Sequence, residues 1–434
     1  MSIALQVALV MVTILVVLLV IGAPIGVAIG MSSAVSMICM IPADVSFATS
    51  AQRIFAGSNS FSLIAIPFFI LAGNIMNNGG IATRLVNCAK VISGRMPGAL
   101  AQSNVVANML FGAISGSGAA AAAAMGGTIG PLEEKEGYDK NYSTAVNVAS
   151  APVGMLIPPS NTMIVYSSVA GSVSIAALFM AGYIPGLLWG GAVMILAGIM
   201  AKKRGYQAEQ RVPVKVALKT FWQAIPSLLL IVIVIGGILG GIFTATEGSA
   251  IAVVYATVLS LIYKAFKIKD IPRIVLEAAK TTGIITFMIG LSSIMSWAMA
   301  FTGIPAAISG VMLSISSNKY VILLIINVIL LIVGTFMDMT PACLIFTPIF
   351  LPICQAVGMN TIHFGIMMIF NLCIGTITPP VGTTLFVGVK VGKTKIEDVI
   401  KPLLYYFAAI FIVLLLVTYI PAISLWLPGL LGYV

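Results

Sequence analysis

Two short stretches of this sequence place a glycine and two adjacent prolines inside apolar segments that otherwise predict membrane helices. They read GMLIPPSNT at 154–162 and GTITPPVGT at 375–383. A Pro-Pro pair removes two helical N–H donors and leaves upstream carbonyl oxygens without partners. Such oxygens can bind a small cation, and a helix that restarts after the prolines points its positive end at an anion. The two stretches predict paired cation and anion sites; a structural kink is the alternative.

Other oxygen-bearing side chains stand in comparable surroundings. Ser115 and Ser117 alternate with glycines before a run of six alanines, which suits the tip of a hairpin. Asp338, in GTFMDMTP, is an ionisable group in an apolar segment, where such groups are by default functional candidates. The residues that follow the prolines are expected to hold a carboxylate at the restarted helix ends. They are Ser160, Asn161, Thr383 and Thr384.

The elements that carry these residues must lie in a membrane. Of 434 residues, 60% are hydrophobic and 8% are charged, whereas a soluble domain carries roughly a quarter charged residues. The net charge of +10 does not indicate a nucleic-acid partner, because the basic residues gather in short loops at 202–219 and 264–273. Basic short loops mark the cytoplasmic side of a membrane protein. We therefore expect an all-α polytopic protein in a lipid bilayer.

An internal repeat relates the two halves. A shift of 221 residues aligns 131–175 with 352–396, and six of the eight identical pairs are Gly or Pro. The basic loop 264–273 maps onto 43–52, which has no base. This difference is expected when equivalent loops face opposite sides of the membrane. The pattern predicts two inverted-topology repeats, with a periplasmic N-terminus.

The predicted repeats occupy residues 1–215 and 216–434. In the first we expect scaffold helices, a re-entrant hairpin near 104–130 and a discontinuous helix near 145–180. In the second we expect scaffold helices, a hairpin near 335–357 and a discontinuous helix near 364–391. Irregular backbone at membrane depth must be buried in protein or line a cavity, so both breaks are expected inside the molecule.

Six segments together resemble the large membrane subunit of tripartite ATP-independent periplasmic (TRAP) transporters, over essentially the whole chain. They are PFFILAGNIM (67–76), SGSGAA (115–120), GMLIPPSNT (154–162), GGIFTATEGSA (240–250), GTFMDMTPACLIFTPIFLP (334–352) and GTITPPVGTTLF (375–386). TATEGSA departs from the commoner form of the family, which leaves the role of Glu247 open. Thr244 and Glu247 have the spacing of a capping box, the interpretation that we favour.

The resemblance implies sodium-coupled import of an organic acid across the bacterial inner membrane. It implies an elevator mechanism in which a transport domain moves against a scaffold, and Na⁺ as coupling ion without a cofactor. One sodium site would use Ser115, Ser117, Gly154, Ile157 and Pro159, and the second Gly334, Thr335, Asp338, Gly375 and Thr378. Two partners are implied, a small four-helix membrane subunit and a soluble periplasmic substrate-binding protein. Sialic acid, C4-dicarboxylates and sugar acids all stay open as substrates.

Other functions fit the sequence less well. An ion-coupled carboxylate symporter of similar inverted architecture, needing no binding protein, is the main alternative, and an ion channel is a weaker one. GVKVGKT at 388–394 has three residues between its glycines where a phosphate-binding loop needs four. A single histidine, His363, makes an enzyme improbable. EEKEGYDK at 133–140 predicts a solvated loop at a helix end, which could also contact a partner.

Overall fold

The structure is a computed structural model that describes residues 3–171, 173–206, 213–316 and 318–433. These residues form helices and no strand. Eight described helices are long and apolar enough to cross a membrane, or nine spans if the bent pair Lys140–Leu156 and Asn161–Val169 counts as one. The predicted all-α polytopic fold is confirmed, while part of the basic loop, 207–212, lies outside the described residues.

The helices of the first half precede the basic loop. They are α1 (Ile3–Val20), α2 (Ile25–Met37), α3 (Ala43–Ser58), η1 (Phe61–Ile64), α4 (Ala65–Asn78), α5 (Ile81–Ser93), α6 (Ala99–Ser115), α7 (Gly118–Lys135), α8 (Lys140–Ser150), α9 (Val153–Leu156), α10 (Asn161–Val169) and α11 (Ile175–Lys203).

The helices of the second half follow the basic loop. They are α12 (Val214–Leu239), α13 (Ala245–Ile262), η2 (Ile268–Asp270), α14 (Ile271–Thr302), α15 (Ile304–Ile315), α16 (Lys319–Phe336), α17 (Met339–Ala356), α18 (Thr361–Gly375), α19 (Thr383–Gly392), α20 (Ile396–Tyr419) and α21 (Pro421–Leu430).

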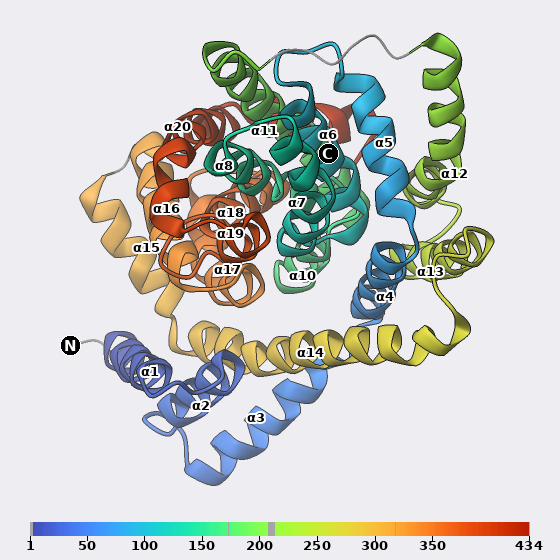
Figure 1. Cartoon of the computed structure of the whole chain (residues 1–434). Coiled ribbons are helices and arrows are strands. Elements are labelled where there is room, and N and C mark those ends of the chain that lie inside the picture. Colours follow the sequence, from blue (N-terminus) through green and yellow to red (C-terminus); the bar gives the residue numbers. More distant parts are fainter. Residues whose placement is uncertain (1–2, 172, 207–212, 317, 434) are drawn as a thin grey trace.

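The long helix α14 runs along one side of the molecule (Figure 1). In that view α1, α2 and α3 lie on one side of it and the remaining helices on the other, and α14 contacts α2, α3, α4 and α17. The hairpins and broken helices pack together beyond α14, so the irregular segments lie within protein, where exposed backbone groups can be satisfied.

Two pairs of helices contact each other across short connections that contain the predicted oxygen ligands. Between α6 and α7 the chain turns at Gly116, which has φ +61°, and Ser117 caps α7 by accepting a hydrogen bond from the Ala120 N–H at 3.3 Å. Between α16 and α17 the connection is Met337 and Asp338. The predicted hairpin, 335–357, contains α17 and this connection but leaves out most of α16, which starts at Lys319 and is as apolar as a simple span.

Each Pro-Pro pair interrupts a helical segment. Pro158-Pro159 separates α9 from α10, and Pro379-Pro380 separates α18 from α19; both Pro-Pro bonds are cis. The first bend measures 47°. The predicted first broken helix, 145–180, extends too far: α10 ends at Val169 and a separate helix starts at Ile175, because Gly171 adopts φ +79° between them.

The helix bounds follow the offset seen in the sequence. Adding 221 to 118 and 135 gives 339 and 356, which are the bounds of α17, and the same shift takes the start of α8 to that of α18. Contacts also occur in matching pairs: α7 packs on α19 and α10 on α17, each joining one half to the other. The division into two inverted repeats at 215 and 216 stays a prediction, and this correspondence supports it.

The segment TATEGSA begins a helix with a capping box. The Thr244 hydroxyl accepts a hydrogen bond from the Glu247 N–H at 3.3 Å, and the Glu247 carboxylate accepts one from the Thr244 N–H at 2.7 Å. The structural role expected for Glu247 is confirmed, because its carboxylate satisfies an N–H group that α13 would otherwise leave unpaired.

Candidate functional site

A central cavity of about 410 Å³ lies where the two hairpin connections meet the starts of α10 and α19. It brings together residues that the sequence separates by more than two hundred positions. The predicted site residues in its lining are Ser115, Ser117, Asn161, Asp338, Thr383 and Thr384. Its volume is within the range of cavities that bind small organic ligands.

Four helices begin at this cavity. Its lining includes Gly118 at the start of α7, Asn161 at the start of α10, Met339 at the start of α17 and Thr383 at the start of α19. A helix start carries unpaired N–H groups and a partial positive charge, so four of them together favour an anion in the space between. At α19 the Thr384 N–H donates to the Thr376 carbonyl at 2.9 Å, which leaves fewer free donors there.

Asp338 supplies the carboxylate of the cavity. It is the N-cap of α17, but its side chain makes no capping hydrogen bond. The Thr383 hydroxyl donates to Asp338 Oδ1 at 3.5 Å, a long contact that joins the second hairpin to α19. An ionised carboxylate beside a space that favours anions also favours a cation next to the anion, because like charges repel.

Four of the predicted residues of the second sodium site, Gly334, Thr335, Gly375 and Thr378, lie close together where α16 meets α18, but Asp338 is not among them. Asp338 lines the central cavity, whereas Thr335 and Thr378 line a separate, apolar cavity beside α20. A Cβ on Gly375 would come within 2.5 Å of the Gly334 backbone, so only glycine permits this approach of α18 to α16. The Val381 N–H donates to the Thr335 carbonyl at 3.0 Å, which attaches the break to the end of α16. The Thr378 hydroxyl donates to the Ile374 carbonyl at 2.7 Å.

The predicted residues of the first sodium site are more dispersed. Gly154 packs on the backbone of Gly112 in α6, three residues before Ser115, and a Cβ at either glycine would collide with the other. Ile157 is buried and packs toward Gly186 of α11. Neither Gly154, Ile157 nor Pro159 lines the cavity, whereas Ser115 and Ser117 do.

Among the predicted substrate residues, too, some line the central cavity and one does not. Asn161 Oδ1 and Thr384 Oγ1 are buried and have no hydrogen-bond partner among the described residues. The Ser160 hydroxyl is also buried without a described partner, but Ser160 is outside the cavity lining. Unpartnered buried polar atoms are costly to the fold, so those of Asn161 and Thr384 are groups that a ligand can satisfy.

Sequence reasoning missed one wall of the cavity. Asn74 and Asn77 of α4 and Thr281 of α14 line it as well. A signal was present, because the two asparagines stand three residues apart in an apolar helix and therefore share a face. Gly73 lies beside them in close contact with the hairpin tip, since a Cβ there would lie 3.2 Å from Ser115 Cα.

No Arg or Lys lines the central cavity within the part of the chain that the structure describes. A second cavity, of about 360 Å³, lies at the other end of α10 and is lined by Arg53, Ser168 and Ser293. The Arg53 guanidinium lies over the Trp297 ring, 5.4 Å from its centroid. Helix α10 therefore connects the central cavity to a cavity that does contain an arginine.

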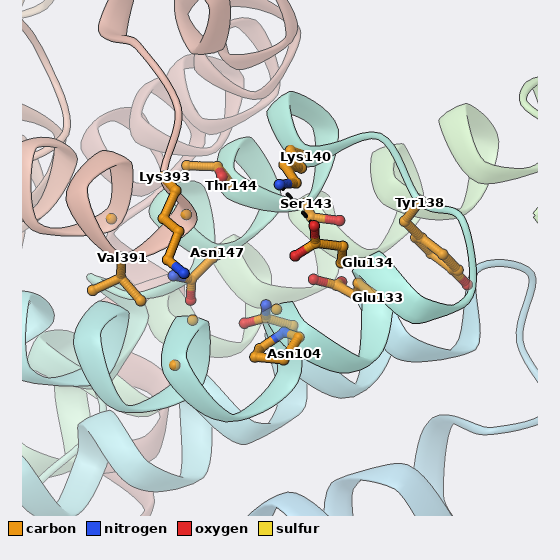
Figure 2. A pocket seen from close by; sticks show the side chains of 16 residues that line it. Asn104, Glu133, Glu134, Tyr138, Lys140, Ser143, Thr144, Asn147, Val391 and Lys393 are labelled. Atoms are coloured by element: carbon orange, nitrogen blue, oxygen red, sulfur yellow. Dashed lines mark ion pairs between the residues drawn. The ribbon is translucent and has the colours of Figure 1, made fainter.

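A third cavity corrects the prediction for EEKEGYDK at one acid, Glu133, whereas most of the segment is exposed at the end of α7, as expected. The segment begins inside α7, and Glu133 is buried, with 1% of its surface exposed. Figure 2 shows this cavity, of about 270 Å³, with Glu133 and Glu134 on α7 and Lys393 at the end of α19. Burial raises the pKa of Glu133 to about 8. A hydrogen bond with Ser143 lowers this pKa, and the negative charge of Glu136 raises it. The alternation of acids and lysines suggested solvent, but the side chain at 133 points inward because α7 continues to Lys135.

Comparisons with known proteins agree with the geometry. The sequence profile of the family described as tripartite ATP-independent periplasmic transporter, DctM component, matches residues 12–423. The chain is 53% identical over 399 residues to the uncharacterized protein YgiK of Salmonella typhimurium, with 92% of each chain covered. It is 42% identical over 384 residues to the isethionate TRAP transporter permease protein DctMQ of Oleidesulfovibrio alaskensis, covering 87% of this chain and 60% of that protein.

A third relative and one solved structure extend these findings. The C4-dicarboxylate TRAP transporter large permease protein DctM of Rhodobacter capsulatus is 37% identical over 401 residues, with 88% of this chain and 90% of that protein covered. The YdaH transporter of Alcanivorax borkumensis, reported to have an unusual topology, matches with a TM-score of 0.61 at 12% identity, over 86% of this chain and 87% of that one. The last likeness concerns the fold alone. The chain belongs to the DctM family, the large permease subunits of tripartite ATP-independent periplasmic transporters, and is a multi-span transport protein rather than an enzyme.

Proposed function

We propose that this permease imports an organic acid together with sodium, by an elevator movement, after receiving the acid from a periplasmic binding protein. The observation that carries the proposal is the central cavity, where four helix starts surround one carboxylate. Helix starts favour the anionic substrate, and Asp338 favours a cation beside it. Family membership implies the small membrane subunit and the binding protein as partners.

The proposed sodium sites keep the residues expected from the sequence. The first uses Ser115 and Ser117 with backbone oxygens of Gly154, Ile157 and Pro159. The second uses Asp338 with Gly334, Thr335, Gly375 and Thr378. In the second set, the close approach of Gly375 to Gly334 and the hydrogen bond from Val381 to Thr335 support a shared location for the backbone ligands, while Asp338 lines the central cavity.

The proposed substrate site comprises Asn161, Thr383 and Thr384, with Ser160 behind them. Relatives named for isethionate and for C4-dicarboxylates indicate the class of acid to try first. The cavity of about 410 Å³ is compatible with small acids of this class.

The proposed movement carries the two hairpins and the two broken helices as one body against α14 and the helices around it. In this proposal the N-terminus faces the periplasm and the loop 202–219 faces the cytoplasm, and the basic residues of that loop support the orientation. Alkaline phosphatase fused before residue 1 should be active, whereas the same enzyme inserted at 207–212 should be inactive. The reverse pattern would overturn the orientation.

Uptake by reconstituted vesicles tests the function. The permease, with its small subunit and binding protein, is supplied with labelled isethionate, succinate or N-acetylneuraminate under an inward sodium gradient. We expect one acid to accumulate only with sodium and only with the binding protein. Uptake without the binding protein would indicate the self-sufficient symporter, and sodium conduction without any acid would indicate a channel.

A further inference from the structure

Glu133 is a buried carboxyl group that neither proposed sodium site nor the substrate site uses. Its side chain is 1% exposed, and Oε1 has no hydrogen-bond partner among the described residues. It lies in the last turn of α7, outside the helices that meet the length and apolarity of a span. A buried ionised carboxylate without a partner is strongly unfavourable, so the group must bind a cation or take up a proton.

Uncharged polar side chains lie in the cavity with Glu133. Asn104 of α6 and Ser143 and Asn147 of α8 line the same cavity, opposite Val391 of α19 (Figure 2). Asn104 Nδ2 is buried without a described partner, and the Ser143 hydroxyl lies within reach of the Glu133 carboxyl group, whose pKa it lowers. Both can hydrogen-bond a carboxyl group, and the Ser143 hydroxyl can also accept from its protonated form.

The basic groups near this cavity already have acidic partners or stand apart from Glu133. Lys140 Nζ lies 2.7 Å from Glu134 Oε1, and Arg204 lies 3.0 Å from Asp139 Oδ2. Lys393 lines the cavity, but no ion pair joins it to Glu133 among the described residues.

Other titratable groups come from the elements around α7. Helices α6 and α9 carry none. The groups on the remaining elements are Arg84, Cys88 and Lys90 of α5, Lys140 and Tyr142 of α8, Lys390 and Lys393 at the end of α19, Tyr406 of α20, and Lys135, Glu136, Tyr138 and Asp139 of the segment that joins α7 to α8.

A proton fits this environment better than a metal ion. No group of three or more His, Cys, Asp or Glu side chains that could hold a metal ion occurs in the described chain. A proton needs only one carboxylate and an acceptor nearby. Burial raises the pKa of Glu133 to about 8, which means that these surroundings favour the protonated carboxyl group. We propose that Glu133 is a proton-binding site, loaded and emptied through the cavity between α7, α8 and α19.

The same two helices connect this site to the central cavity. Gly118 at the start of α7 lines the central cavity, and Glu133 is 15 residues further along, about 22 Å at 1.5 Å per residue. Thr383 at the start of α19 lines the central cavity, and Lys393 at its end lines the Glu133 cavity. A coupling of proton binding to transport rests on the proposed function, whereas proton binding itself does not.

The test is the unfolding midpoint of the purified protein between pH 5 and pH 9, at fixed sodium and without substrate. The folded-state pKa, about 8, is raised above the reference value of 4.5, so the folded protein binds one more proton than the unfolded chain in this window. Stability therefore falls as pH rises from about 4.5 to about 8, and this fall ends above pH 8. Glu133→Gln should lose this fall, whereas Glu134→Gln, next to it but exposed, should keep it.

Infrared difference spectra give a second readout that does not depend on the folding of the variant. A carboxylic C=O band should be lost from the wild type as pH rises through about 8, and should also be seen in Glu134→Gln and Asp338→Asn. Absence of that band, or a pH dependence of stability that Glu133→Gln leaves intact, would overturn the proposal. So would a loss of sodium-specific stabilisation in Glu133→Gln, which would instead assign a sodium ion to the cavity. If Asp338 does not bind sodium, the pH dependence of stability and the carboxylic band expected for Glu133 stay the same.

Discussion

At the scale of single residues, the central cavity offers oxygens that the fold itself does not use. The Thr384 hydroxyl and the Asn161 carbonyl oxygen are buried without described partners. The Asp338 carboxylate does not cap its helix and accepts a long contact of 3.5 Å from the Thr383 hydroxyl. In a site that serves only the fold, such atoms would be hydrogen-bonded. Because these oxygens are not fully hydrogen-bonded within the protein, we assign them to a ligand.

Thr384→Val tests this assignment. Valine keeps the shape of threonine, and its introduction removes a hydroxyl that has no partner in the fold, so stability should stay the same or rise. The half-saturating concentration of the transported acid should rise about tenfold, which corresponds to roughly 1.4 kcal/mol. Uptake kinetics and thermal unfolding measure the two effects separately.

The matched control is Thr257→Val in α13, where the hydroxyl donates to the Val253 carbonyl at 2.7 Å and the residue is outside the cavity lining. This variant should transport normally. A Thr384→Val protein with unchanged uptake kinetics would remove Thr384 from the substrate site.

At the scale of elements, both breaks depend on contacts between glycines. Gly375 lies against Gly334, and Gly154 against Gly112, so each broken helix approaches a hairpin arm at backbone distance. Glycine lowers the stability of a helix, and the close approach of Gly334 explains why α18 has a glycine at 375. The breaks are held in place by these contacts as well as by the prolines.

Gly375→Ala should therefore destabilise the protein by about 1–3 kcal/mol, the usual cost of overpacking, because the new Cβ would come within 2.5 Å of Gly334. Sodium-dependent stabilisation should fall with it. Gly283→Ala in α14 is the control, since no atom lies within 4 Å of the Cβ position there. That change should be neutral or stabilising by roughly 0.5–1 kcal/mol. Equal denaturation midpoints for the two variants would contradict the role of the contact.

The sequence predicted these elements unequally. The breaks at 158–159 and 379–380 and the hairpin tip at Ser117 follow from Gly, Pro and Ser, whose backbone preferences act locally. The sequence could not predict whether α16 is a simple span or an arm of the second hairpin, because its apolar sequence suits both. The burial of Glu133 and the wall formed by Asn74 and Asn77 depend on contacts between distant segments, which composition does not encode.

At the scale of the whole molecule, residues of both halves form one site. The contacts of α7 with α19 and of α10 with α17 each join one half to the other, and the central cavity lies where these helices start. Helix α14 contacts both α4 and α17, which places a long helix of the proposed scaffold beside the proposed transport domain. An elevator movement requires this interface to slide during transport.

A covalent link across that interface should stop transport. Ser168 of α10 and Ser293 of α14 line one cavity from the two sides of the proposed boundary. Both serines are changed to Cys, and Cys39, the one natural cysteine that is exposed among those described, is changed to Ser. A short bifunctional methanethiosulfonate, which forms a disulfide with each thiol and releases sulfinate, should then abolish uptake. Reductant should restore it, and either single cysteine should be unaffected. Full uptake by the linked protein would exclude the proposed movement.

The most direct test of the central claim is the unfolding midpoint of the purified protein in NaCl and in KCl at matched ionic strength. A ligand that binds only the folded state stabilises it by about 1.4 kcal/mol when its concentration is about tenfold above Kd. We predict that sodium raises the midpoint more than potassium does and that Asp338→Asn removes most of the difference. Asp44→Asn, an exposed acid of α3, should keep it. Identical midpoints in the two salts would contradict the sodium sites at the two breaks.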